Sequence, residues 1–331
     1  MPTAVPDHHT LLRALEYAVR APSIYNSQPW RWRAADNTGV DLFADPTRRL
    51  HVVDPDGRDL LLSCGAALHH LGVALGQSGF ATSVTRFPDP QNCHHLARVR
   101  LRRCNPSAEV ARLAQAIGRR RTDRRRFSDE AVEESALRVL MEQAATHGAV
   151  LRIAFEVGVR ARLIELLALS GSLQLQQPGY IAELARWAGR KARCGDGIDA
   201  RSVPMGIDHP GEVPMRRFPR ARLAQSPHSF EHDDASTLMV LASPSDDRLD
   251  VLRAGEAASA VLLAATDLGL ATTPLSQPVQ VPQTRESINA EIFGSKLQAQ
   301  MVLRVGWAHP GAPDLPPSSR RRIEHVAKVN R

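Results

Sequence analysis

Apolar residues recur at helical spacing near the start of the chain. Leu11 and Leu15 lie four residues apart, so both fall on one face of a helix. The pattern predicts an amphipathic helix over residues 7–20, in which Asp7 or Thr10 could cap the first turn.

Similar patterns predict the other elements. Alternating or buried runs predict strands at residues 30–33, 40–44, 81–87, 96–102, 150–155, 237–242 and 299–308. Longer apolar patterns predict helices at residues 60–77, 129–147, 162–175, 180–190, 253–270 and 281–293, and a polar linker that becomes helical over 105–117. The 331 residues are enough for two modest domains or one elaborated domain.

The composition of the chain indicates its cellular location. Hydrophobic residues make up 43% of it, but no apolar run reaches the roughly 20 residues of a membrane helix. The start has no basic segment followed by an apolar stretch, so we expect neither a signal peptide nor a membrane partner. The cysteines show no paired spacing, which indicates free thiols in the cytoplasm: Cys64, Cys93, Cys104 and Cys194.

Arginine gives the chain a formal net charge of +7 and clusters at residues 119–126 and 320–322. Such clusters bind either nucleic acid or one small phosphorylated ligand. Aromatic residues make up only 5% of the chain, which is poor for stacking bases, and no helix-turn-helix pattern is present. The adjacent histidine pairs at 69–70 and 94–95 have no partner at a metal-ligand spacing. We therefore expect no nucleic acid partner and no metal.

A polar loop follows the predicted first helix. Pro22 and Pro29 fix the backbone at its two ends. Between them, Ser23, Asn26 and Gln28 can donate and accept hydrogen bonds, which suits a neutral ligand with many oxygens. An ordinary helix-to-strand turn has a similar composition, so the residues alone leave both interpretations open.

This loop resembles the signature of the nitroreductase family of flavin-dependent oxidoreductases. The family run, Pro-Ser-x-x-Asn-x-Gln-Pro-Trp, is matched with its spacing from Pro22 to Trp30. In that family it meets the ribityl chain and ring of FMN. The resemblance implies cofactor contacts from Ser23, Asn26, Ser27, Gln28, Pro29, Trp30, Arg31 and Trp32.

The first arginine cluster resembles a second family signature, Arg-x-Ser-x-(Arg/Lys)-x-Phe. Arg120, Thr122, Arg124 and Phe127 match it, with Thr for Ser and one extra residue before the phenylalanine. The alternative is a solvated charge run. As a phosphate site, the segment would use arginine forks, including Arg121, and the threonine hydroxyl. The resemblance implies that Arg124 lies near the pyrimidine edge of the flavin.

Two further segments are similar to family motifs. Ser318, Arg320 and Arg321 lie in a tail like the family's closing phosphate-binding motif, although a frayed basic terminus is the alternative. The resemblance implies that Leu275 and Ser276 present backbone N–H groups to the redox edge of the ring. Many members have Glu-Gly where this chain has Ser276 and the residue after it. No catalytic acid or base is implied, because the flavin supplies the hydride chemistry.

The two signatures stand in different parts of the chain. In the family the arginine signature is N-terminal, whereas here it lies in mid-chain, and residues 144–149 contain no second Pro-Ser-x-x-Asn loop. A gapless offset of 190 matches Gly65, Ala67, Ala74, Gly79, Ala81 and Thr82 with Gly255, Ala257, Ala264, Gly269, Ala271 and Thr272. We therefore divide the chain into two fused halves: residues 1–110, with the ring and ribityl loop, and residues 111–331, with the phosphate site.

The chain is most similar to the fused, two-halved Acg-type NAD(P)H nitroreductases of mycobacteria. The resemblance implies an α+β, nitroreductase-like fold whose halves form a pseudo-dimer within one chain. One complementary set of signatures implies one FMN per chain and a monomer. The implied function is an oxidoreductase that passes electrons from NAD(P)H through FMN to a nitroaromatic or quinone-like acceptor. The alternative is an FMN-sequestering or storage protein.

Residues 194–233, which we call the excursion, are too long for a bare loop in a compact fold. The excursion contains stiffening prolines and apolar anchors: Pro204, Pro210, Pro214, Pro219, Met205, Met215 and Phe218. A disordered insert would have little use for those anchors. We therefore predict that the excursion folds over the flavin as a lid that excludes NAD(P)H and bulky acceptors.

Overall fold

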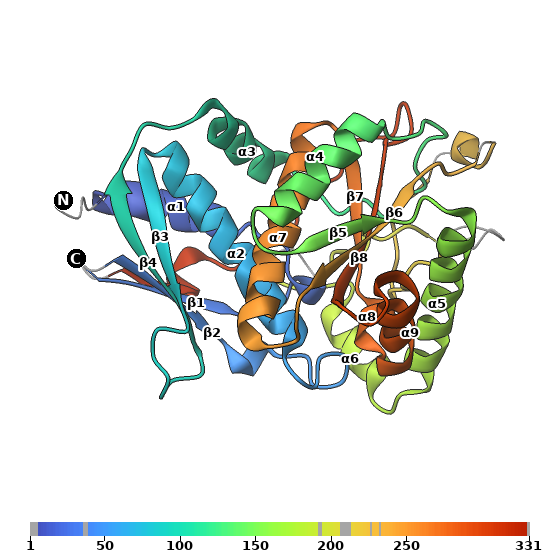
Figure 1. Ribbon diagram of the computed structural model, residues 1–331, viewed down its shortest axis with the longest axis horizontal. Coiled ribbons are helices and arrows are strands. Elements are labelled where there is room, and N and C mark those ends of the chain that lie inside the picture. Colours follow the sequence, from blue (N-terminus) through green and yellow to red (C-terminus); the bar gives the residue numbers. More distant parts are fainter. Residues whose placement is uncertain are drawn as a thin grey trace.

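Two long helices lie between two sheets in the protein, whose computed structural model describes residues 6–35, 39–190, 194–205, 213–225, 227–231 and 233–329. In Figure 1 one sheet lies at the left and the other at the right, and α2 (Arg58–Gln77) and α7 (Arg248–Asp267) run between them. This mixed architecture of helices and sheets confirms the predicted α+β class.

The first sheet combines strands from both ends of the chain. Its strands are β1 (Trp30–Ala35), β2 (Gly39–Ala44), β3 (Phe80–Arg86), β4 (His95–Arg103) and β9 (Ala327–Val329), in the order β3-β4-β2-β1-β9. All neighbours are antiparallel except β9, which runs parallel to β1. The C-terminal tail therefore forms the outer strand of a sheet that is otherwise built from the N-terminal part of the chain.

The second sheet repeats the strand order of the first. It contains β5 (Val150–Ile153), β6 (Thr237–Ser243), β7 (Ala271–Leu275) and β8 (Gln298–Gly306), in the order β5-β6-β8-β7, with every neighbour antiparallel. In chain order, β1 to β4 therefore correspond to β5 to β8. Because β7 is an edge strand, it tolerates Pro274, which cannot donate a backbone hydrogen bond.

The other described helices are α1 (His8–Ala18), α3 (Ala108–Arg119), α4 (Glu134–Ala145), α5 (Val157–Gln176), α6 (Tyr180–Trp187), α8 (Gln277–Gln280) and α9 (Pro282–Phe293). Most of them pack on the sheets, while α3 packs on α2 and α7, and α6 packs on the excursion and the residues before α2. Apolar residues of α4 and α7 pack on one face of the second sheet, and those of α5, α8 and α9 pack on the other. Helix α3 runs across residue 110, where we divide the chain, so the exact boundary between the halves stays a proposal.

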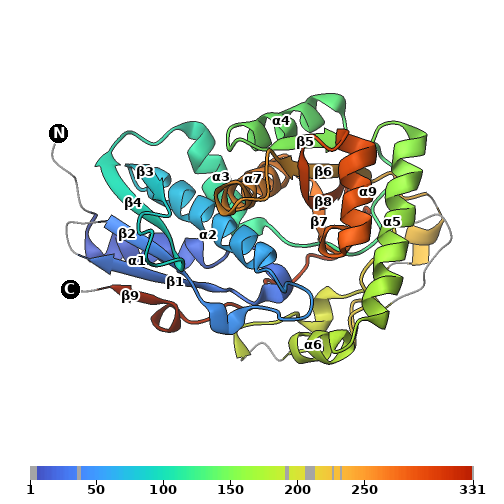
Figure 2. The ribbon, with the colours of Figure 1, turned by 60° about the horizontal axis from the view of Figure 1, so that its bottom comes forward.

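Glycine allows the two central helices to approach closely (Figure 2). A Cβ on Gly65 would lie 2.1 Å from the carbonyl oxygen of Leu252, and one on Gly255 would lie 2.2 Å from that of Leu62. These two contacts are reciprocal, because each glycine meets the residue three positions before the other. The glycines that the sequence repeat pairs therefore meet at the crossing of α2 and α7.

Capping residues set several helix ends where the sequence predicts them. Asp7 caps α1, since its Oδ1 accepts a hydrogen bond from the backbone N–H of Thr10 at 2.8 Å. Gly79 and Gly269 each follow a central helix in the left-handed conformation, both with φ of +83°. The two helices of the repeat therefore end in the same way.

Three predicted helix starts are wrong. The sequence patterns place them at residues 129, 162 and 253, but α4, α5 and α7 begin at Glu134, Val157 and Arg248. The residues before α4 are bonded to the segment that follows β8 instead: Phe127 forms a β-bridge with Ala308, and Ser128 N–H donates to the carbonyl oxygen of Trp307 at 2.9 Å. Tertiary pairing therefore overrides the local helical pattern here.

Helix α2 has the length and apolarity of a membrane span. However, 83% of its apolar window is buried inside the protein. A core helix passes the same test, so this helix is only weak evidence for a membrane.

Candidate active site

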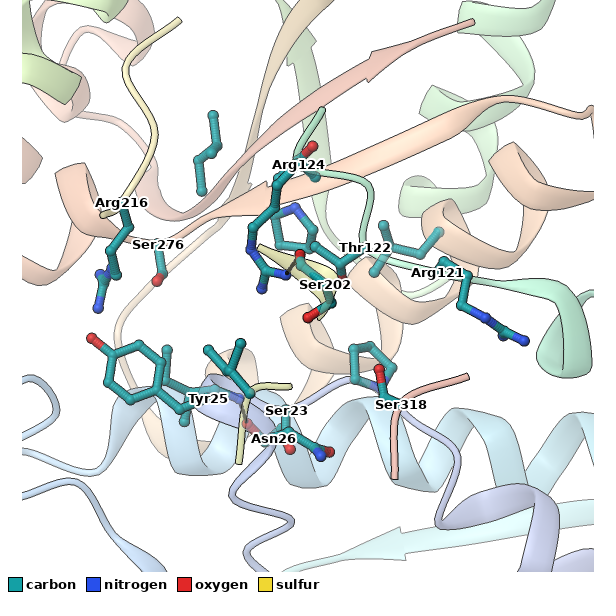
Figure 3. A pocket seen from close by; sticks show the side chains of 18 of the residues that line it. Ser23, Tyr25, Asn26, Arg121, Thr122, Arg124, Ser202, Arg216, Ser276 and Ser318 are labelled. Carbon is teal, nitrogen blue, oxygen red and sulfur yellow. Dashed lines mark hydrogen bonds between the residues drawn. The ribbon is translucent and has the colours of Figure 1, made fainter. Parts of the chain in front are cut away.

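A cavity lies where segments far apart in the sequence meet (Figure 3). Polar walls come from residues 22–26, 120–124, 273–277 and 315–320. The apolar wall comes from Leu62 and Ala66 on α2 and from Ala258 and Leu262 on α7. The excursion adds Gly197, Ile198, Asp199, Ser202, Met215, Arg216 and Phe218. Its residues 206–212, 226 and 232, which include Pro210, lie outside the described residues.

The loop after α1 has an unusual backbone. Tyr25, Asn26 and Gln28 have φ of 49°, 53° and 51°, a left-handed region that residues other than glycine seldom adopt. Side-chain oxygens hold the loop in this shape: Ser23 Oγ accepts from Gln28 N–H at 3.0 Å, and Ser63 Oγ on α2 accepts from the loop at 3.1 Å. Such strain persists only where the surroundings enforce it, and it is concentrated at functional sites.

The predicted cofactor-binding residues divide into two groups. Those that line the cavity are Ser23, Asn26, Arg120, Arg121, Thr122, Arg124, Leu275, Ser276, Ser318 and Arg320. Those outside its lining are Ser27, Gln28, Pro29, Trp30, Arg31, Trp32 and Arg321. In the second group, Trp30 and Trp32 lie in the core of the first sheet, 0% and 2% exposed. Contact of either group with a cofactor stays a prediction.

The loop also fixes the excursion and the tail in place. Gln28 Nε2 donates to the carbonyl oxygen of Gly195 at 2.8 Å, and Gln28 Oε1 accepts from the backbone N–H of Arg321 at 2.9 Å. Asn26 Nδ2 donates to the carbonyl oxygen of Gly197 and to one in the tail, each at 3.0 Å. Asn26 Oδ1 is buried and has no hydrogen-bond partner within the described ranges, so it can still accept.

One end of the cavity, which we call the cationic end, is formed by Arg120, Arg121 and Arg320. The arginine segment reaches it because the backbone N–H of Asp123 donates to Thr272 on β7 at 2.9 Å. Burial, together with the charges of Arg121 and Arg124, lowers the pKa of Arg120 to about 10. Burial and the charges of Arg120 and Arg121 lower the pKa of Arg320 to about 9.

These cations have no anionic partner among the residues that the structure describes. Arg120 is 6% exposed, and neither its Nε and Nη1 atoms nor Arg320 Nε has a hydrogen-bond partner in this part of the chain. Within the described part of the chain, no carboxylate oxygen lies within 4.0 Å of the guanidinium nitrogens of Arg120, Arg121 or Arg320. Buried charges are normally paired, so this arrangement is suited to an anionic ligand.

Arg124 lies between the two ends of the cavity, and the other end, which we call the tyrosine end, is formed by Tyr25, Arg216 and Ser276 (Figure 3). Arg124 Nη1 donates to the carbonyl oxygen of Ser202 at 3.2 Å, and its guanidinium lies 5.2 Å from the Phe218 ring centroid. Burial lowers the pKa of Arg124 to about 10 and that of Arg216 to about 9. Both side chains remain cationic at neutral pH.

Three polar residues at the tyrosine end are not predicted from the sequence: Arg216, Gln280 and Asp59. Gln280 Oε1 accepts from Arg216 Nη2 at 2.7 Å, and Gln280 Nε2 donates to Ser276 Oγ at 3.1 Å and to Asp59. Arg216 lies in an aperiodic segment rich in arginine, so nothing distinguishes it from its neighbours. Asp59 lies in the first turn of α2, where an acidic residue is expected for helix stability alone. Only the folded chain brings these side chains together.

The sequence comparisons bear on this geometry. No protein-family model matches the chain. It is 42% identical over 328 residues to "Putative NAD(P)H nitroreductase Rv3131" of Mycobacterium tuberculosis (strain ATCC 25618 / H37Rv), covering 99% of this chain and 94% of the relative. It is 36% identical over 334 residues to "Putative NAD(P)H nitroreductase acg" of the same strain, covering 99% and 98%. The chain belongs to the Acg-type nitroreductase family.

The structural comparison agrees with this membership. The crystal structure of a "putative nitroreductase" from Anabaena variabilis ATCC 29413 matches with a TM-score of 0.51, covering 92% of this chain and 90% of that chain. The two sequences are only 11% identical over that match, so the likeness shows the fold alone. The nitroreductase-like fold and the Acg-type resemblance are both confirmed.

Proposed function

We propose that this Acg-type protein is an FMN-dependent oxidoreductase that takes electrons from NAD(P)H and passes them to a nitroaromatic or quinone-like acceptor. The observation that carries the proposal is the cationic end, where the buried Arg120 and the half-buried Arg121 and Arg320 line the cavity beside the signature loop without a carboxylate partner among the described residues. FMN bound there would supply the hydride and electron transfer. The names of the mycobacterial relatives support the nicotinamide donor.

The residues present fit FMN. A phosphate group needs charge-assisted hydrogen bonds, and the unpartnered nitrogens of Arg120 and Arg320 can donate them. Asn26 Oδ1 can accept from a hydroxyl of the ribityl chain. Ala66 and Ala258 present small apolar side chains to the cavity, so a flat ring can approach α2 and α7.

Each predicted residue has a role in this proposal. Arg120, Arg121, Thr122, Ser318 and Arg320 bind the phosphate, while Ser23 and Asn26 face the ribityl chain and ring. Arg124 stabilises negative charge at the pyrimidine edge, and the backbone N–H groups of Leu275 and Ser276 face the redox edge. Ser27, Gln28, Pro29, Trp30, Arg31, Trp32 and Arg321 hold the loop, β1 and the tail that carry the lining residues.

The second candidate function is FMN sequestration. It is supported by the excursion, because Met215, Arg216 and Phe218 line the cavity and can cover a ligand. Ser276 and Gln277 also stand where many nitroreductases have Glu-Gly. In this alternative the protein holds FMN but excludes NAD(P)H.

The primary test is titration of the purified protein with FMN, followed by anaerobic addition of NADH or NADPH. We expect a flavin-to-protein ratio near one, a monomer by light scattering, and bleaching of the flavin absorbance by one nicotinamide. A protein that takes up no FMN contradicts both candidates, and FMN uptake without bleaching contradicts the first.

A deletion in the excursion separates the two candidates. The residues on either side of its central part lie close together, because Met205 N–H donates to the carbonyl oxygen of Leu223 at 2.9 Å. Residues 206–221 can therefore be replaced by two glycines without stretching the chain. If the excursion is a lid, the deletion raises the rate of reduction by NADPH and leaves that by dithionite unchanged. Equal NADPH rates in both proteins contradict the lid.

A further inference from the structure

The tyrosine end holds a cation that the phosphate of FMN does not require. Figure 3 shows Arg216, Tyr25 and Ser276 at one end of the cavity, and Arg121, Thr122 and Ser318 at the other. A ligand anchored by its phosphate at the cationic end therefore leaves Arg216 for a second ligand.

Arg216 is held in position but is not neutralised. Its Nη2 donates to Gln280 at 2.7 Å, and its guanidinium lies 4.9 Å from the Tyr25 ring centroid and 5.9 Å from that of Tyr180. Its Nη1 is buried and has no hydrogen-bond partner among the described residues. Among the described residues, no carboxylate oxygen lies within 4.0 Å of this guanidinium.

Asp59, which lines the same cavity, has its own counter-ion. Its Oδ1 pairs with Arg58 Nη2 at 2.8 Å, and its Oδ2 accepts from Gln280. The amide of Gln280 therefore separates Asp59 from Arg216. The charge of Arg216 remains available to an anion that enters the cavity.

The neighbouring groups match a carboxylate on an apolar body. The Tyr25 hydroxyl is buried and has no hydrogen-bond partner in the described part of the chain, while the Ser276 hydroxyl accepts from Gln280 and keeps its own proton to donate. Together with Arg216 Nη1 they offer several donors to one pair of carboxylate oxygens. Met215 and Phe218 line the cavity beside them and provide apolar contact.

From this arrangement we infer that the tyrosine end binds the carboxylate of a small aromatic acid, and that this acid carries the nitro or quinone group that would accept the electrons supplied by NAD(P)H in the proposed function. The inference deepens the proposed function and rests on it. Arg216 could alternatively serve only to pin the excursion across the cavity. In that case its replacement would change stability but not the choice between an anion and a neutral isostere.

Calorimetric titration with benzoate and benzamide tests the inference, because the two probes share their shape and differ in charge. With FMN-saturated protein, we expect benzoate to bind at least tenfold more tightly than benzamide. Arg216→Gln should weaken benzoate about tenfold to hundredfold and abolish the preference, since it removes a charge-assisted hydrogen bond. Arg216→Lys should keep the preference. Arg222→Gln is the matched control, because Arg222 lies exposed in the same excursion.

Tyr25→Phe provides a second variant in case Arg216→Gln does not fold. It removes one hydroxyl and should weaken benzoate about twofold to tenfold. Equal affinity of the unmodified protein for both probes, or a preference that survives Arg216→Gln, overturns the inference. FMN uptake is measured on the same samples. A protein that binds no FMN contradicts the proposed function, while the response of benzoate to Arg216→Gln still decides the carboxylate site.

Discussion

The two sheets share one strand order but differ in what connects their strands. Residues 36–38 join β1 to β2, whereas residues 154–236 join the corresponding strands β5 and β6 and carry α5, α6 and the excursion. Residues 87–94 join β3 to β4, whereas residues 276–297 join β7 to β8 and carry α8 and α9. The long connections supply Arg216, Ser276 and Gln280. The frame is therefore common to both sheets, and two of the three residues that form the tyrosine end of the cavity come from connections that only the second sheet carries.

Comparing the segments that precede the corresponding elements of the two sheets explains why each signature occurs once in the chain. The strained loop precedes β1, while the segment before β5 has no such loop. The arginine segment precedes α4, while α1, at the corresponding place before β1, has no arginine cluster ahead of it. The loop before β1 and the arginine segment before α4 therefore each contribute to the cavity once. Substitutions can test this difference between the two regions, and the largest expected effect comes first.

Replacing an arginine of the cationic end tests the contribution of the segment before α4 and of the tail. Arg120→Ala or Arg320→Ala should weaken FMN binding about tenfold to hundredfold, because each removes charge-assisted hydrogen bonds to phosphate. Arg112→Ala is the control, since Arg112 is exposed and pairs with Asp267 at 3.1 Å. Fluorescence titration measures the three affinities. Equal losses in all variants would mean that the arginines act through general charge.

A methyl group at the crossing of α2 and α7 tests the shared frame. Gly65→Ala should lower the free energy of unfolding by about 1–3 kcal/mol, because the added Cβ would overlap the backbone of α7. Gly72→Ala is the matched control on the same helix, where the nearest atom, Thr82 Oγ1, lies 3.7 Å away. That change should be neutral or stabilising by up to about 1 kcal/mol. Urea denaturation of both variants decides whether the crossing is as tight as the structure shows.

One repeat position carries histidine on α2 and serine on α7. His69 Nδ1 and Ser259 Oγ, 190 residues apart, are hydrogen-bonded at 2.9 Å. Burial and the charge of His147 lower the pKa of His69 to about 3, while Glu256 and Arg86 lie beyond His147.

His69 therefore binds a proton less readily in the folded protein than in the unfolded chain. Its stability should be independent of His69 above pH 6.5 and should fall as pH drops from 6.5 towards 3, by up to about 1.4 kcal/mol per pH unit. His69→Ser makes the two positions identical and should flatten this part of the pH profile. An unchanged slope in denaturation curves between pH 7 and 5 would show that His69 does not contribute.

The smallest effect concerns a side-chain cap that α1 has and α4 lacks. Asp7 caps α1, whereas Glu133, at the corresponding position before α4, makes no capping hydrogen bond. Glu133→Ser should raise the free energy of unfolding by about 0.5–1 kcal/mol, because a serine oxygen can accept from the first-turn N–H groups. Glu134→Ser, one residue inside the helix, is the control and should give no gain. A difference below the error of thermal denaturation would contradict the prediction.

Local patterns predict elements well where neighbouring residues determine them. Helix α2 begins two residues before its predicted start and ends at the predicted Gln77, because its apolar pattern and following glycine are both local signals. The three-residue strand β9 has no such signal, since it exists only through pairing with β1. The start of α4 is wrong for the same reason, as Phe127 pairs with the segment that follows β8.

The candidate site shows the same limit. Short motifs identify the segments that meet at the cavity, including Asn26, Arg120 and Arg320. They do not show that Gln28 bonds to the tail and the excursion, or that Arg216 reaches Gln280. Those relations depend on contacts across more than 60 residues of sequence, which no local pattern records.

The position of the tail has a consequence for biosynthesis. Arg320 and β9 come from the end of the sequence, yet they complete the cavity and the first sheet, where Trp32 N–H donates to the carbonyl oxygen of Val326 at 2.7 Å. Because a ribosome releases the N-terminus first, β1 emerges with an edge that stays unpaired until β9 has been translated. The cavity likewise lacks Arg320 until that residue has been translated. A nascent chain stalled between residues 35 and 320 would therefore expose the β1 edge to aggregation.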